Sequence, residues 1–71
     1  MMNGRDLLRW LTSQCERHHE GTGILIRSRT KDASDATCKA VAEALIKSLS
    51  DHQANGDFKS SLVVMLDAMV D

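Results

Sequence analysis

The sequence predicts a mainly α-helical fold with one short β-strand. Apolar residues recur at helical spacing in three segments, and a short β-branched run follows the first of them. Turn-forming residues separate the segments at Gly21-Thr22-Gly23 and at Asn55-Gly56-Asp57. The predicted elements are helices at about residues 3–20, 33–53 and 57–70, and a strand at about residues 24–30. With 71 residues in all, the chain is expected to form one small domain, residues 1–71.

The first helix is predicted from its ends and from an apolar face. Asn3 is a favourable N-cap, and Asp6 stands three residues further on, in the place of a capping-box acid. Gly21 suits the C′ position at the other end. At about 100° per residue, one arc of the helix collects most of the apolar side chains. This arc contains Leu7, Leu8, Trp10, Leu11, Cys15 and His18.

The segment after the first helix is predicted to form the strand. Ile24-Leu25-Ile26 follows a glycine and contains two β-branched residues, which favour strands. Alternate residues of a strand point to opposite sides. One side would carry Ile24, Ile26, Ser28 and Thr30, and the other Leu25, Arg27, Arg29 and Lys31. An extended loop that lies over the helices is the alternative for residues 22–31.

Two further helices complete the prediction. The segment at 33–53 opens at Asp32 or Ser34 and carries an apolar stripe of Cys38, Val41, Ala42, Leu45, Ile46 and Leu49. The segment at 57–70 is capped by Asn55 or Asp57 and has Phe58, Leu62, Met65, Leu66 and Met69 on one face. Several more apolar residues surround that face, so the last helix is apolar around most of its circumference and needs cover on both sides.

Two of these features predict a homodimer. A lone strand leaves its backbone N–H and C=O groups unpaired, and a second copy of the strand would pair them. A second copy would also cover the last helix. The predicted interface consists of Ile24, Ile26, Phe58, Leu62, Val63, Met65, Leu66 and Met69. A monomer with residues 22–31 as a loop is the alternative.

The sequence offers little to support catalysis or metal binding. Cys15 and Cys38 fall on apolar helix faces, where a free thiol packs as a small hydrophobic group. Cys15, His18 and His19 give a C-x-x-H-H pattern, but no second ligand pair completes a tetrahedral zinc site. Nucleotide-binding glycine loops are absent as well. We therefore expect no catalytic residues, no metal, no cofactor and no enzymatic activity.

The charge and the hydropathy of the chain indicate its cellular location and exclude some classes of partner. Nine basic and ten acidic residues give a formal charge of −1, so no overall positive field attracts nucleic acid. The longest apolar run, Leu62-Val63-Val64-Met65-Leu66, is far shorter than the roughly 20 residues that span a membrane. The first residues lack the apolar core of a secretory signal. These observations predict a cytoplasmic protein without a membrane partner.

A basic stripe on the predicted strand is the most distinctive cluster. It comprises Arg27, Arg29 and Lys31, and pairing across a twofold axis would double it. The order strand–helix–helix, with alternate strand residues facing outward, resembles the ribbon-helix-helix family of dimeric DNA-binding proteins. The resemblance covers residues 24–70 and places Leu25, Arg27 and Arg29 at the outward positions. It implies a paired ribbon that contacts base edges in the major groove. A solvated edge that discourages aggregation is the plainer alternative.

The sequence thus favours a small homodimeric interaction protein that binds an unidentified protein partner. Its predicted binding residues are Arg27, Arg29 and Lys31 on the strand and Arg5, Arg9 and Trp10 on the first helix. Tryptophan and arginine are the residue types that dominate binding hot spots. A dimeric DNA-binding regulator that uses the basic strand is the alternative function.

Overall fold

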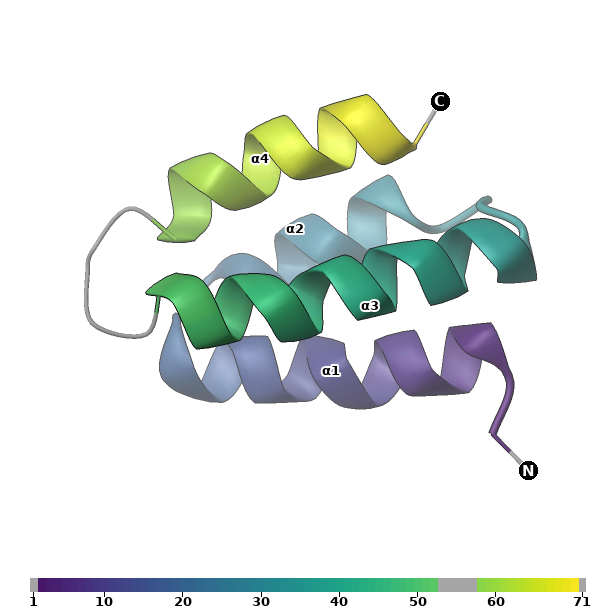
Figure 1. Ribbon diagram of the computed structural model, residues 1–71, viewed down its shortest axis with the longest axis horizontal. Helices are drawn as coiled ribbons and strands as arrows, with labels where there is room; N and C mark the ends of the chain where they lie inside the picture. Colours follow the sequence, from purple (N-terminus) through teal and green to yellow (C-terminus); the bar gives the residue numbers. More distant parts are fainter. Residues whose placement is uncertain (1, 53–57, 71) are drawn as a thin grey trace.

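Four α-helices make up the part of the chain that the computed structural model describes, residues 2–52 and 58–70 (Figure 1). They are α1 (Gly4–His18), α2 (Thr22–Arg29), α3 (Asp35–His52) and α4 (Phe58–Met69). The three predicted helices correspond to α1, α3 and α4, with ends that differ by one or two residues. The predicted strand is wrong, because the described residues contain no strand and residues 22–29 form α2.

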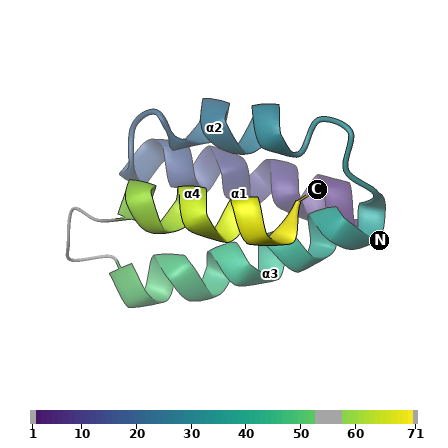
Figure 2. The ribbon, with the colours of Figure 1, turned by 90° about the horizontal axis from the view of Figure 1, so that it is seen from above.

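The helices surround one apolar core. α1 packs against α2 and α3, and α4 packs against the same two helices, so each helix has two neighbours (Figures 1 and 2). Every helix contributes buried side chains to the core. They are Leu8, Leu11 and Cys15 of α1, Ile26 of α2, Cys38, Val41, Ala42 and Leu45 of α3, and Phe58, Leu62 and Leu66 of α4. Both cysteines are free thiols, which agrees with their predicted role as packing residues.

The burial pattern of α2 explains why the segment is a helix. Thr22, Ile26 and Thr30 are buried and lie four residues apart, which is helical spacing. Ile24 is 71% exposed, although a strand would have placed it on the same side as Ile26. With apolar residues on opposite sides, the segment lacks the amphipathic pattern by which short helices are detected. The two β-branched isoleucines therefore favoured the wrong prediction.

Helix α2 begins where the carboxylate of Glu16 caps it. Gly21 precedes the helix with a left-handed φ of +93° and has no side chain to offer. The Glu16 carboxylate accepts hydrogen bonds from the N–H of Gly21, at 3.1 and 3.2 Å, and from the N–H of Gly23, at 2.9 Å. The predicted place of Gly21 as C′ of the first helix therefore changes, because α1 ends at His18 with His19 as its C-cap. A negative group at this end also complements the helix dipole.

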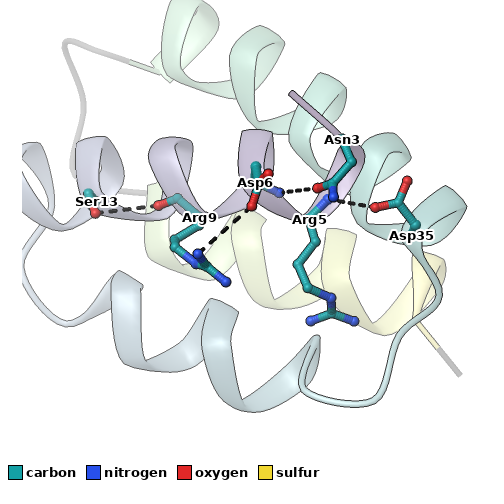
Figure 3. Close-up of polar contacts among 6 residues, drawn as sticks. All are labelled: Asn3, Arg5, Asp6, Arg9, Ser13 and Asp35. Atoms are coloured by element: carbon teal, nitrogen blue, oxygen red, sulfur yellow. Dashed lines mark hydrogen bonds and ion pairs between the residues drawn. The ribbon is translucent and has the colours of Figure 1, made fainter. Parts of the chain in front are cut away.

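The N-terminus of α1 is fixed by two side chains (Figure 3). Asn3 caps it as predicted, and its side-chain oxygen accepts a hydrogen bond of 2.8 Å from the N–H of Asp6. Asp35, in the first turn of α3, accepts from the N–H groups of Gly4 and Arg5 at 3.2 and 3.0 Å. A Cβ atom at Gly4 would lie 2.9 Å from the Cβ of Lys39, so glycine permits this close approach of α1 to α3.

The remaining predicted caps concern α3 and α4. Ser34, one of the two predicted starting points of the third segment, accepts a hydrogen bond of 3.2 Å from the N–H of Thr37 and so caps α3. The caps predicted for the last helix, Asn55 or Asp57, lie outside the described residues. Within the described ranges, none of the helices combines the length and the hydropathy needed to cross a membrane.

Candidate functional site

Four basic side chains gather along a groove between α1 and α2. Arg5 and Arg9 come from α1, Arg27 comes from α2, and Lys31 follows the end of α2. The groove encloses about 120 Å³, and Leu8, Thr12 and Thr30 complete its lining. We call it the basic groove. Four of the six predicted binding residues therefore meet at one site, although two of them were expected on a strand.

Helical spacing brings these side chains together. Arg5 and Arg9 are four residues apart and share one side of α1, and Arg27 and Lys31 are also four residues apart. Figure 3 shows the side chains of Arg5 and Arg9 leaving α1 on the side where α2 lies. The groove is thus lined by two pairs of cations, one pair from each side.

The acidic groups near the groove neutralise it only in part. Arg9 lies 3.8 Å from Asp6 in an exposed pair, which contributes little binding energy in water. Arg5 donates a hydrogen bond to the carbonyl of Ala33, which carries no net charge. Lys31 is exposed and makes no ion pair within the described residues.

Arg27 lies near Glu16, the one carboxylate among the described residues whose pKa is shifted. The hydrogen bonds from Gly21 and Gly23 lower the pKa of Glu16, and the positive charges of Arg27 and Lys59 lower it further. Glu16 therefore stays ionised at neutral pH, at the end of the groove that is nearest to the start of α2. The groove keeps a positive centre with carboxylates near its edges.

The two buried threonines at the floor of the groove have no free O–H donor to offer a ligand. Thr12 and Thr30 are buried, and their hydroxyls donate to the carbonyls of Leu8 and Ile26 at 2.6 and 2.7 Å. These intrahelical bonds satisfy both hydroxyls. Recognition in the groove therefore depends on the charged side chains at its rim.

Arg29 does not belong to the basic groove. It pairs with Asp67 of α4, on the side of α2 that faces away from α1. Two residues along a helix correspond to a rotation of about 200°, whereas in a strand they share a side. The predicted stripe of Arg27, Arg29 and Lys31 is therefore divided between two sides of α2.

Trp10 lines a second, larger pocket. Its lining consists of Trp10, Leu11, Gln14, His18, His19, Leu49 and Ser50 from α1, α3 and the turn after α1, and its volume is about 430 Å³. We call it the Trp10 pocket. Trp10 is 55% exposed, and His19 stacks on Phe58 with ring centroids 4.2 Å apart. Of the residues that line this pocket, Trp10 alone was predicted to bind a partner, although Trp10, Gln14 and His18 recur every four residues, a spacing that places them on one side of α1.

The groups considered for zinc or thiol chemistry are not brought together. Cys15 is fully buried while His18 is exposed, so the C-x-x-H-H pattern does not converge on one point. Burial raises the pKa of the Cys15 thiol to about 11, so the thiol stays protonated at neutral pH. The described residues hold no cluster of three or more potential metal ligands.

The predicted dimer-interface residues fall into two groups. Ile26, Phe58, Leu62 and Leu66 are buried in the core of a single chain. Val63, Met65 and Met69 are half-buried, and Ile24 is exposed. The homodimer itself stays a prediction, but the strand pairing that suggested it is absent, since residues 24–29 belong to α2.

Comparison with known proteins assigns this chain to no family. The chain matches no protein-family model, no curated protein and no solved structure. The resemblance to ribbon-helix-helix proteins fails on the fold, because the segment that should form the ribbon is the helix α2.

Proposed function

We propose that this chain is a small non-enzymatic interaction protein whose basic groove binds an acidic segment of a partner protein. The observation that carries the proposal is the convergence of Arg5, Arg9, Arg27 and Lys31 on one groove. Complementary charge gives such an interface its specificity and a fast association rate. A cytoplasmic location and self-association into a homodimer remain separate predictions from the sequence.

The size and surroundings of the groove favour a short acidic segment over a nucleic acid. Asp6 lies beside Arg9, and Glu16 lies beside Arg27, so a long phosphate backbone would meet carboxylates near the groove. The chain as a whole carries a formal charge of −1, whereas nucleic-acid-binding domains have a basic footprint. A few carboxylates of a peptide match the four cations without extending past them.

A charge-reversal experiment tests the proposal. A fluorescently labelled peptide with a run of glutamates is titrated with the protein at low salt, and anisotropy reports binding. We expect the double variant R9E/K31E to weaken binding by about tenfold or more, because like charges then face each other across the interface. The matched control K39E/K47E reverses two exposed cations of α3 outside the groove and should bind as the unaltered chain does.

Two results would contradict the proposal. Equal losses in both double variants would mean that only the overall charge matters. Tighter binding of a DNA duplex than of the peptide, with a steep salt dependence that the groove variant reduces, would reassign the groove to nucleic acid.

A further inference from the structure

We infer that the acidic segment crosses α1 and places a large apolar side chain in the Trp10 pocket. This inference rests on the proposed function of the basic groove and specifies the partner segment further.

The Trp10 pocket has the size and lining for an apolar side chain. Its volume of about 430 Å³ lies within the range of ligand pockets, about 300–1,000 Å³. Trp10, Leu11 and Leu49 supply apolar walls, and polar groups such as Gln14 and Ser50 also line the pocket. Ile46, which is 50% exposed, lies one turn before Leu49 on α3 and extends the apolar surface. An exposed tryptophan beside such a hollow is a typical binding hot spot.

The two sites lie on opposite flanks of one exposed helix. Arg9 lines the basic groove, and Trp10, the next residue, lines the pocket on the side of α3. A helix with its side chains is about 10–12 Å wide, so a path over its exposed face from one flank to the other is about 16–19 Å long, which about five or six residues of extended chain span. A segment that holds acidic residues in the groove therefore reaches the pocket with a side chain about five or six positions away.

The charges of the basic groove and the lining of the Trp10 pocket together determine which partner segment fits both sites. The cations of the groove require carboxylates on one flank, while the pocket offers the apolar side chains of Trp10, Leu11 and Leu49 on the other. The partner chemistry that fits is an acidic segment with a single large apolar residue at this spacing.

The indole of Trp10 provides a direct readout. The chain contains one tryptophan and no tyrosine, so its emission reports the pocket and not the groove. The probes are two labelled peptides that share the same run of glutamates and differ at one position beyond it, leucine in one and serine in the other. We expect the leucine peptide to bind about tenfold tighter and to shift the indole emission to shorter wavelength, because an apolar side chain leaves water.

Variants separate the two sites. W10A should lose the advantage of the leucine peptide while it still binds the serine peptide, and R9E/K31E should weaken both. V64A is the matched control, because it truncates another exposed apolar residue, 70% exposed, on α4. Circular dichroism of each variant checks that the helices are retained.

The outcomes distinguish the use of the Trp10 pocket from the proposed function of the basic groove. Equal affinities for the two peptides, or an unchanged indole emission, would overturn the use of the pocket and leave the basic groove in place. Failure of both peptides to bind at low salt would overturn the proposed function itself. A loss of self-association in W10A, with unchanged peptide affinities, would assign the pocket to a second copy of this chain and overturn the inference.

Discussion

Glu16 belongs to α1 by sequence but stabilises the start of α2. Its carboxylate accepts hydrogen bonds from the N–H groups of Gly21 and Gly23, and these bonds lower its pKa from the ordinary value of 4.5. A carboxyl group with a lowered pKa in the folded state stabilises the fold fully above its unfolded pKa. This contribution disappears as the pH falls through the folded pKa.

The substitution E16Q is therefore expected to destabilise the protein in a pH-dependent manner. At neutral pH the variant should unfold at a lower urea concentration than the unaltered chain, because a neutral amide caps the helix less well than a carboxylate. The gap should narrow as the pH falls below 4.5, where protonation removes the same charge from Glu16. Urea unfolding curves of both proteins at several pH values measure this difference between the two urea midpoints.

Glu20 offers a matched control for this charge change. It is exposed and accepts no hydrogen bond from the described residues. E20Q should leave the urea midpoint nearly unchanged at every pH. A gap between E16Q and the unaltered chain that is the same at neutral and acidic pH would contradict the capping role of the carboxylate.

Gly4 illustrates a residue whose lack of a side chain matters for packing. A Cβ atom at this position would lie 2.9 Å from the Cβ of Lys39 and 3.0 Å from its backbone nitrogen, and would also meet the carbonyl of Asp35. We expect G4A to destabilise the fold by about 1–3 kcal/mol, which is typical of an overpacked contact. Helix propensity alone predicts a gain, because alanine favours a helix over glycine. Chemical denaturation distinguishes the two, and a stabilised variant would show that α1 and α3 are not in close contact here.

Three of the four helices in the described part of the chain were predictable from the sequence because each carries its own signals. Of the apolar stripe predicted for α3, residues 38, 41, 42 and 45 are buried, whereas Leu49 is half-buried and Ile46 is 50% exposed. The cap of α1 lies next to it in sequence, at Asn3. Helix α2 has neither signal, because its isoleucines face opposite sides and its cap comes from Glu16 of another helix. Its helical state depends on tertiary contacts, which local propensity does not contain.

The two isoleucines of α2 distinguish the helix from the predicted strand by mutation. Ile26 is fully buried, so I26A should cost about 2–5 kcal/mol of unfolding free energy, as large-to-small core substitutions do. Ile24 is 71% exposed, and I24A should cost no more than about 0.5 kcal/mol. A strand with both residues on its buried face would make the two costs similar. Urea unfolding of both variants measures the difference.

The four cations of the basic groove could be predicted as binding residues from the sequence, but their arrangement around one groove could not. Arg5 and Arg9 were predicted to bind a partner because arginine is a typical hot-spot residue, and Arg27 and Lys31 because they belong to a basic stripe. The same reasoning grouped Arg29 with them, since it assumed a period of two residues. The helical period of α2 places Arg29 on a different side of the helix from Arg27 and Lys31. The position of α2 beside α1 brings Arg5 and Arg9 to the same groove.

At the scale of the whole molecule, the four helices close an apolar core within one chain. The prediction of a dimer rested on an unpaired strand and on the apolar circumference of α4. Helix α2 satisfies its backbone internally, and Phe58, Leu62 and Leu66 of α4 are buried by the other helices. Among the described helices, the large apolar residues that stay exposed are Trp10 on α1, Ile24 on α2, Ile46 on α3 and Val64 on α4. The predicted homodimer would therefore join chains that are already folded.

The closed core predicts that the thermal stability of the protein does not depend on protein concentration. When a protein folds only as a dimer, its unfolding midpoint rises with protein concentration, because mass action favours the assembled state. Because the core of this chain is closed without a second copy, we expect the thermal midpoint to stay constant over about a hundredfold range of concentration. Light scattering on the same samples gives the number of chains per particle. A constant midpoint would show that the fold does not depend on a second copy, whereas a midpoint that rises with concentration would show that a second copy stabilises the folded chain by mass action.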